Sequence, residues 1–367
     1  MKGISKTIKR PIFDRMNRQP ESIQPLDLPI VFVLAKGRSG TTLLQTMLEA
    51  HPNTVAPLES RFVVHFRNRY GSVKRWTPSV KKRFIEDVLS ELKISLFWEM
   101  DVPALTRRIE LLPEDSSYGL VCKQVYVSRL ALFEQQEPKV IIDKNPIHAL
   151  LLPLITDVFP DARFIHVIRD YRANSSSFYK FQPHKTMREL GHMWVLYNEK
   201  IERLKTEKPN RFHTLRYESL VREPEHELRE ISDFLGLSFD PMMVNYHGTI
   251  GELYDAYVRR SPSEKVKKIR ELASQTVHKN LTRPLDARLL NTWKEKLTGA
   301  QIETLNSICS EYAARYTDDA AVNHVEPKIP KDIKFKAEKL LWYYRLPIWL
   351  RELKSKPNLA LLPKNDQ

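Results

Sequence analysis

The feature that most constrains the fold is an apolar run followed at once by a glycine-containing turn and a helical pattern. Residues 30–35, Ile-Val-Phe-Val-Leu-Ala, are continuously apolar and rich in β-branched side chains, which is typical of a strand buried on both faces of a parallel sheet. The turn at 36–40, Lys-Gly-Arg-Ser-Gly, follows it. Leu44 and Leu48 then lie on one helical face until Pro52 ends the helix. This order predicts a strand, loop and helix unit.

Three later apolar runs extend this unit into a larger sheet. They occupy residues 139–143, 163–168 and 212–215, and a helical pattern follows each one. Such alternation predicts an α/β fold with a central parallel sheet flanked by helices and joined by right-handed crossovers. We predict a basic N-terminal arm at 1–28, one large domain at 29–325 with a helical cap insertion at about 79–136, and a basic, aromatic C-terminal helical segment at 326–367.

Composition limits the partners and the compartment. Lys and Arg exceed Asp and Glu by 59 to 45, which favours anionic ligands, nucleic acid or an acidic membrane without choosing among them. The two cysteines lie far apart and form no metal-binding pattern, so we expect no metal and a reducing compartment. Neither a signal peptide nor a membrane-spanning segment is predicted. The expected location is the cytoplasm, with peripheral contact at a membrane surface left open.

The turn after the first strand has the composition of an anion-binding loop. Backbone N–H groups and the positive end of the helix dipole converge at such a turn. Gly37 and Gly40 permit a tight path, and Arg38 adds a positive fork. Hydroxyl donors come from Ser39, Thr41 and Thr42. The alternative is an ordinary helix start capped by hydroxyl side chains.

This loop does not fit the phosphate-binding loop of nucleoside triphosphatases. That motif requires a first glycine and a lysine where this chain has Ala35 and Thr41. Without the lysine, Mg²⁺-dependent γ-phosphate transfer loses a main electrostatic component. A kinase or nucleoside triphosphatase remains one alternative function. A basic nucleic-acid-binding protein is another, although no RNP-like or zinc-finger pattern appears and we expect no nucleic-acid partner.

Three segments together resemble the sulfotransferases that use 3′-phosphoadenosine 5′-phosphosulfate (PAPS). Residues 37–44 look like the family's 5′-phosphosulfate-binding loop, and Arg169 with Ser177 eight residues later is similar to its 3′-phosphate site. The segment beginning Arg216-Tyr217 resembles a third family motif. The resemblance implies a nucleotide-kinase-like α/β fold, PAPS as sulfuryl donor without a metal, and Tyr217 beside the adenine. Local backbone bonding for Ser177 and core packing for Tyr217 remain the alternatives.

The resemblance also implies the catalytic residues. Glu59 stands where the tyrosylprotein branch has its general base, and Arg61 would position the acceptor or keep Glu59 ionised. Lys144, at a predicted strand end, matches a family lysine that stabilises the leaving group together with Arg38. An ion pair at a helix start is the alternative for Glu59, and a surface pair with a neighbouring aspartate is the alternative for Lys144.

Two further residues are assigned to the cofactor by the same resemblance. Asn291 stands where the family has a serine that helps to bind the transferring group, and an amide can still donate a hydrogen bond there. Arg283, on the preceding loop, could reach a phosphate of the cofactor. The substitution at 291 leaves kinship to enzymes with protein-tyrosine acceptors open.

The C-terminal segment and the acceptor are the least constrained parts. Aromatic residues alternate with lysines and arginines between 331 and 356, which suits a membrane surface. A helix packed on the core with solvated lysines is the alternative. The acceptor is a small-molecule, glycan or lipid hydroxyl whose identity the sequence does not give, and the oligomeric state is equally open. The segment's apolar residues are Leu340, Leu341, Trp342, Tyr343, Tyr344, Leu346, Ile348, Trp349 and Leu350.

Overall fold

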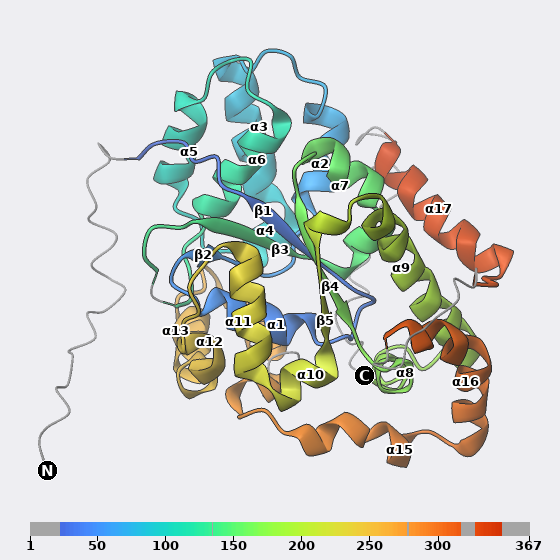
Figure 1. Ribbon diagram of the computed structural model, residues 1–367. Helices are drawn as coiled ribbons and strands as arrows, with labels where there is room; N and C mark the ends of the chain where they lie inside the picture. Colours follow the sequence, from blue (N-terminus) through green and yellow to red (C-terminus); the bar gives the residue numbers. More distant parts are fainter. Residues whose placement is uncertain (1–22, 134, 277–278, 317–326, 347–367) are drawn as a thin grey trace, which may run out of the picture.

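The computed structural model of the chain describes residues 23–133, 135–276, 279–316 and 327–346. Within these ranges the chain forms a five-stranded sheet, and all of its strand pairs are parallel (Figure 1). Its order is β2-β3-β1-β4-β5, and the strands are β1 (Ile30–Leu34), β2 (Thr54–Val55), β3 (Val140–Lys144), β4 (Arg163–Ile168) and β5 (Phe212–Arg216). The predicted α/β class and its parallel sheet are confirmed.

The central position of β1 explains its unbroken apolar run. All five residues of β1 are buried. Phe32 and Leu34 pack into the core on one face of the sheet, whereas Val31 and Val33 pack into the core on the other. Because successive side chains of a strand point to opposite faces, a strand covered on both faces needs apolar residues at every position.

Helices cover both faces of this sheet. One core is shared with α2 (Phe62–Tyr70), α6 (Tyr118–Val127), α7 (Leu152–Val158) and α9 (Met187–Glu207). The opposite core is shared with α1 (Thr41–Glu49), α10 (Tyr217–Arg222), α11 (Pro224–Leu235), α12 (Met242–Asn245) and α13 (Ile250–Arg259). Both layers rest on β1, so the loop that leaves β1 is fixed from two sides.

The chain between β2 and β3 is mainly helical. It contains α2, α3 (Pro78–Ser90), α4 (Leu92–Phe97), α5 (Val102–Leu111) and α6. Side chains of Thr77, Asp101 and Ser117 cap the starts of α3, α5 and α6, which satisfies N–H groups that have no partner inside the helix. Trp76 is fully buried in this region.

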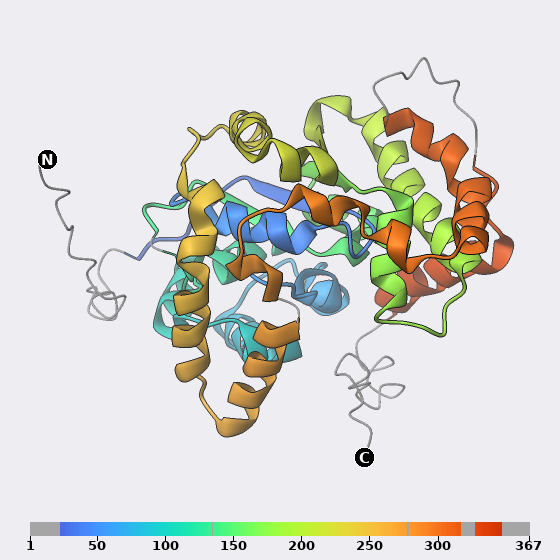
Figure 2. The same ribbon diagram turned by 90° about the horizontal axis from the view of Figure 1, so that it is seen from below.

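Further helices follow β3 along the chain. They include the short helices η3 (Pro146–Leu150), η6 (Lys279–Thr282) and η7 (Ala287–Asn291) and the α-helices α8 (Tyr171–Tyr179), α14 (Glu264–Thr276), α15 (Trp293–Lys296) and α16 (Gly299–Ala313). Three further short helices are η4 (Pro209–Arg211), η5 (Tyr246–Gly248) and η8 (Ala314–Tyr316). Figure 2 shows α13 and α14, which pack against each other, extending away from the sheet.

Both ends of the described chain pack on this body. In the N-terminal part, the backbone of Leu26 exchanges two hydrogen bonds with the side chain of Gln124 in α6. The C-terminal helix α17 (Lys331–Arg345) packs against α2 and α9. Residues 1–22 of the predicted arm and 347–367 of the predicted C-terminal segment lie outside the described residues. Among the residues described, no helix has the length and apolar character needed to cross a bilayer.

Candidate active site

The loop between β1 and α1 has a backbone that only particular residues permit. Gly40 has a φ of 87°, and Arg38 has a φ of 73°. A Cβ atom on Gly40 would lie 2.1 Å from Cδ2 of Tyr217, so glycine is required there both by conformation and by space. Positive φ at Arg38 is costly for a residue with a side chain and is found most often at functional sites.

A buried polar network holds this loop against α8. Lys36 is 1% exposed, and its Nζ donates to Oδ1 of Asn174 at 2.7 Å. The amide nitrogen of Asn174 donates to the carbonyl of Gly37 and to Oγ of Ser39, both at 3.0 Å. Burial lowers the pKa of Lys36 to about 7. Asn174 thus positions the loop relative to the helix that carries Ser177.

Four predicted cofactor residues meet in one group, here called the guanidinium cluster: Arg38, Arg169, Ser177 and Tyr217. Nε of Arg38 donates to Oγ of Ser177 at 3.2 Å, and Nη1 of Arg169 donates to the carbonyl of Arg38 at 3.1 Å. The guanidinium of Arg169 lies 4.4 Å from the centre of the Tyr217 ring. From the sequence, Arg38 was assigned to a 5′-phosphosulfate site and Ser177 to a separate 3′-phosphate site. In the structure the two side chains are hydrogen-bonded to each other.

The guanidinium cluster is built to receive an anion. Within the described residues, neither Arg38 nor Arg169 forms an ion pair with a carboxylate, and the buried Nε of Arg169 has no hydrogen-bond partner. Burial and the nearby Arg169 lower the pKa of Arg38. Two unneutralised guanidinium groups and an unsatisfied buried donor suit a phosphate, which accepts several charge-assisted hydrogen bonds.

A second group, here called the carboxylate cluster, contains Glu59, Lys144 and Thr42. Nζ of Lys144 lies 2.6 Å from Oε1 of Glu59 and 3.4 Å from Oγ1 of Thr42. The Lys144 side chain is 3% exposed, whereas that of Glu59 is 46% exposed. Burial alone would raise the pKa of Glu59, but the Lys144 ammonium, with Arg61 and Lys93, lowers it below its ordinary value. Glu59 is therefore an accessible, ionised carboxylate at neutral pH.

The segment that carries Glu59 is fixed on both sides. Nε1 of Trp98 donates to the carbonyl of Leu58 at 2.9 Å, and Nδ2 of Asn145 donates to the carbonyl of Ser60 at 2.9 Å. The main chain is thus held at both neighbours of Glu59, and the Glu59 side chain is held by Lys144.

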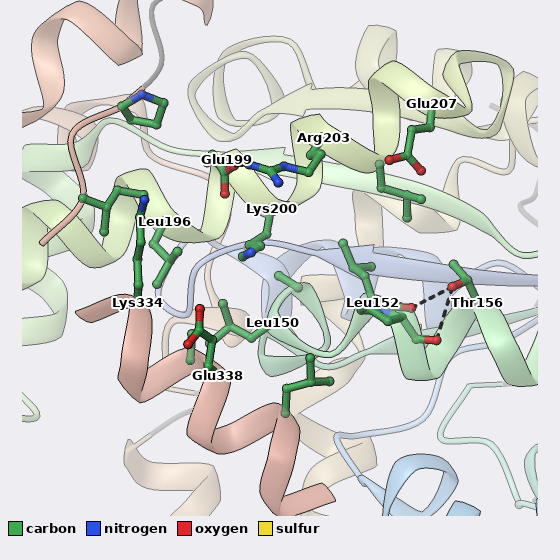
Figure 3. Close-up of a pocket in the computed structure, with 17 residues that line it drawn as sticks. Leu150, Leu152, Thr156, Leu196, Glu199, Lys200, Arg203, Glu207, Lys334 and Glu338 are labelled. Atoms are coloured by element: carbon green, nitrogen blue, oxygen red, sulfur yellow. Dashed lines mark hydrogen bonds and ion pairs between the residues drawn. The ribbon is translucent and has the colours of Figure 1, made fainter. Parts of the chain in front are cut away.

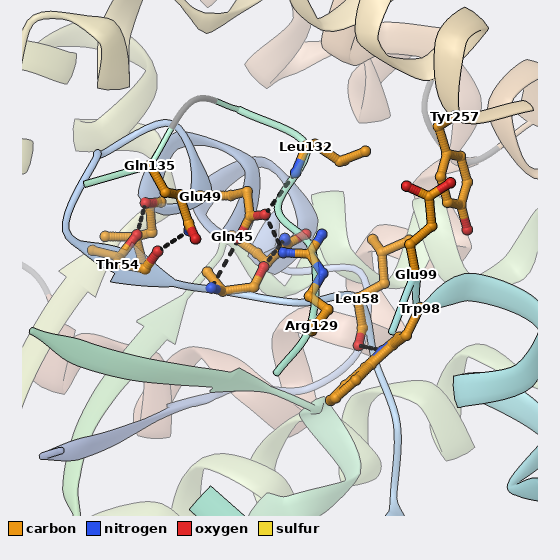
Figure 4. Close-up of polar contacts among 12 residues, drawn as sticks. Gln45, Glu49, Thr54, Leu58, Trp98, Glu99, Arg129, Leu132, Gln135 and Tyr257 are labelled. Atoms are coloured by element: carbon orange, nitrogen blue, oxygen red, sulfur yellow. Dashed lines mark hydrogen bonds and ion pairs between the residues drawn. The ribbon is translucent and has the colours of Figure 1, made fainter. Parts of the chain in front are cut away.

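A buried ion pair holds the chain three residues before Glu59, at Ala56 (Figure 4). Glu49, at the end of α1, pairs with Arg129, and their side chains are 1% and 4% exposed. The other oxygen of Glu49 accepts a hydrogen bond from the backbone of Ala56 at 2.8 Å. Because α1 begins at the loop that carries Arg38, one helix links the two clusters.

Arg61 contacts the C-terminal helix. It precedes α2, and its Nη1 donates to the phenol oxygen of Tyr344 in α17 at 3.3 Å. Nδ2 of Asn68 donates to the carbonyl of Tyr344 at 2.9 Å. The predicted acceptor side is therefore bounded by α17, whose Tyr344 lies 283 residues from Arg61 in sequence.

Two predicted cofactor residues stand apart. Arg283 and Asn291 are exposed, and within the described residues neither has a hydrogen bond to the guanidinium or the carboxylate cluster. Asn291 ends η7, which packs against α10, the helix that begins with Tyr217. Their assignment to the cofactor stays a prediction.

Sequence reasoning missed Lys36, Asn174 and Phe181. The Phe181 ring lies 4.2 Å from the Arg38 guanidinium. Lys36 and Asn174 match no motif, and their only signal is a polar residue at a position that is otherwise buried. The hydrogen bond between them joins residues 138 positions apart, and a contact of that range cannot be predicted from spacing along the chain.

A cavity of about 580 Å³ lies away from both clusters. It is bounded by η3, α7, α9 and α17, with Leu152 and Leu196 in its lining and Lys200 and Glu338 among its charged groups (Figure 3). None of the predicted site residues lines it. Among the residues described, no group of three or more His, Cys, Asp or Glu side chains is arranged to hold a metal ion.

The fold and these clusters define a class, an α/β protein with a group of cations suited to an anionic ligand where the strands of a parallel sheet end. The sequence profile described as "Sulfotransferase family" matches residues 29–241, so the chain belongs to that family. The protein is a PAPS-dependent sulfotransferase, an enzyme that transfers a sulfuryl group to an acceptor.

Several curated proteins are similar to the chain. A putative protein-tyrosine sulfotransferase of Caenorhabditis briggsae is 25% identical over 65% of this chain and 76% of its own length. Protein-tyrosine sulfotransferase 1 of Danio rerio is 21% identical over 74% and 67%. The omega-hydroxy-beta-dihydromenaquinone-9 sulfotransferase Stf3 of Mycobacterium bovis is 32% identical over 57% and 63%. A solved sulfotransferase domain from the curacin biosynthetic pathway shares 20% identity over 77% and 98%, with a TM-score of 0.47.

Proposed function

We propose that the two clusters divide the work of sulfuryl transfer to an acceptor hydroxyl. PAPS supplies the sulfuryl group, and the guanidinium cluster would hold its 3′-phosphate and 5′ end through Arg38, Arg169 and Ser177. Tyr217 would lie beside the adenine. The loop residues Gly37, Ser39, Gly40, Thr41 and Thr42 would bind the 5′ end through backbone N–H and hydroxyl groups. The unsatisfied Nε of Arg169 supports this fit.

The carboxylate cluster would carry the proton transfer. Glu59 would accept the proton of the acceptor hydroxyl at Oε1 or Oε2, since it is ionised and 46% exposed. Lys144 would stabilise the charge that develops on the leaving side. Arg61 would orient the acceptor. The observation that carries the proposal is the Glu59–Lys144 ion pair. Lys144 also bonds Thr42 in the first turn of α1, directly after the loop that carries Arg38.

The acceptor is proposed only as a hydroxyl of a glycan, a lipid or sterol, or another alcohol. The names of similar proteins specify a protein tyrosine in one case and a hydroxylated dihydromenaquinone in another. Both chemistries need the same base and the same positive groups. A panel of acceptors assayed with labelled PAPS would identify the class.

The test of the cofactor site is thermal stabilisation by 3′-phosphoadenosine 5′-phosphate in the presence of EDTA. We expect the nucleotide to raise Tm without divalent metal, since a ligand that binds only the folded state stabilises it. R38A and R169A should each abolish the rise, and K82Q, a change on the exposed side of α3, should keep it. The absence of any rise in the wild-type protein would refute the proposed cofactor site.

The same experiment separates the kinase alternative. A phosphoryl-transfer enzyme would be stabilised more by ATP with Mg²⁺ than by 3′-phosphoadenosine 5′-phosphate. A nucleic-acid-binding protein would instead show an affinity that falls steeply with salt. We expect neither behaviour, since the clusters gather their cations at one loop rather than along an extended surface.

A further inference from the structure

The C-terminal helix α17 has two faces of different character. Ile333, Ala337 and Tyr344 are buried against the body of the protein. These positions are separated by four and seven residues, so they lie on one side of the helix. That packing confirms that the helix docks on the core and leaves its other side to solvent.

The outer face of α17 carries two large exposed aromatic side chains. Phe335 is 64% exposed and Trp342 is 56% exposed. Because they are seven residues apart, about two helical turns, they lie on the same side. Lys331 and Lys339 flank Phe335 by four residues in each direction and share that side. We call Lys331, Phe335, Lys339 and Trp342 the outer face.

The charge of the helix is positive around this face. The five basic residues of α17 are Lys331, Lys334, Lys336, Lys339 and Arg345, and the two acidic ones are Asp332 and Glu338. All seven are exposed. Lys336 pairs with Glu189 of α9 at 3.1 Å. The excess of three positive charges on α17 is part of the formal net charge of +14 of the chain.

We propose that the outer face binds an anionic lipid surface. Trp and Phe insert readily at the boundary between headgroups and acyl chains, and lysines beside them attract anionic headgroups while their stems cover apolar surface. A protein partner fits less well, since lysine is depleted from the centres of protein interfaces. Here a lysine stands between the two aromatic residues.

The arrangement has a geometric consequence for the site. Tyr344 bonds Arg61 from the inner side of α17, so a lipid surface on the outer face would lie about one helix diameter, roughly 10 Å, from the acceptor side. A lipid-borne hydroxyl would then have to extend about that far from the membrane surface to approach Glu59. This consequence rests on the proposed function, whereas lipid binding itself does not.

The experiment is flotation of the full chain with vesicles, without nucleotide or acceptor. We expect binding to vesicles of phosphatidylcholine with phosphatidylglycerol and little binding to phosphatidylcholine alone. F335A/W342A should lower the affinity at least about tenfold, since each ring loses buried apolar area. K331Q/K339Q should lower the affinity about tenfold. Added salt should weaken vesicle binding by the wild-type protein more than binding by this variant.

Matched controls come from α5, which lies far from α17 in Figure 1. Val102 and Leu111 are 40% and 37% exposed, so V102A/L111A removes exposed apolar surface elsewhere. K82Q/R107Q removes two exposed charges from α3 and α5. Both controls should float like the wild-type protein.

Three results would overturn the proposal. One is absence of wild-type binding to anionic vesicles, and another is equal binding of F335A/W342A and wild type. The third is a dimer in light scattering that F335A/W342A dissociates, which would make the outer face a contact between copies. None of these results bears on the proposed cofactor site, because that proposal is tested separately by the rise in Tm with nucleotide.

Discussion

The two clusters of the site are held in different ways. The loop of the guanidinium cluster rests on buried polar contacts, of which Lys36 to Asn174 is the deepest. In the carboxylate cluster, the Glu59 side chain is 46% exposed, and the nearby Arg61 donates to the phenol oxygen of Tyr344 in the last turn of α17. A rigid nucleotide side and an open acceptor side suit an enzyme whose donor is fixed and whose acceptor must enter and leave. Changes on the first side should therefore alter nucleotide affinity, and changes on the second should alter turnover.

The largest expected effect is on the acceptor side. E59Q keeps the shape of the side chain but removes its ability to accept a proton, so turnover should fall about 10²- to 10⁴-fold. The affinity for 3′-phosphoadenosine 5′-phosphate, measured by calorimetry, should stay within about twofold because Glu59 lies outside the guanidinium cluster. Normal turnover by E59Q would exclude Glu59 as the base.

The next effect is on the nucleotide side. G40A forces a side chain into a positive φ and against the Tyr217 ring, with strain of about 1–3 kcal/mol. Nucleotide affinity should fall about 10- to 100-fold by calorimetry, since the loop and Tyr217 must both shift. G248A is the control, because a Cβ there meets nothing within 4 Å. Equal affinity in G40A and G248A would show that the loop tolerates rearrangement.

A smaller effect tests Asn174 as a positioning residue. N174D still offers Lys36 an acceptor but can no longer donate to Gly37 and Ser39, so nucleotide affinity should fall about tenfold. N174A also leaves Lys36 without its acceptor and should lower the free energy of unfolding more than N174D does. Nucleotide titrations and urea unfolding of both variants separate these roles. Unchanged nucleotide affinity in both variants would show that Asn174 does not position the nucleotide-binding loop.

A final effect is a pH dependence of stability. Burial lowers the pKa of Lys36 to about 7, whereas an unfolded lysine titrates near 10.4. Between these values the unfolded chain binds more protons than the folded one, so the free energy of unfolding should rise with pH. K36M removes this contribution, so wild type should gain stability relative to K36M between pH 7 and 10 in urea unfolding. If the free energies of unfolding of wild type and K36M changed with pH in parallel, the lowered pKa of Lys36 would be contradicted.

Local sequence determined the elements and the residue types of the site. The unbroken apolar run at 30–35 predicted a central strand, because burial on both faces leaves no position for a polar side chain. Gly40, Arg38 and Glu59 were predicted as site residues because a loop after a strand and a matching motif fix their spacing. The two-residue strand β2 was missed because a period cannot be read from so short a segment.

Tertiary structure decided which of those residues meet. It placed Arg38 on Ser177, Lys36 on Asn174 and Arg61 on Tyr344, contacts that join residues 138 to 283 positions apart. It left Arg283 and Asn291 exposed and apart from both clusters. Contacts of this range depend on how helices pack around the sheet. Side-chain spacing along a chain reports only neighbours within a few turns of one element.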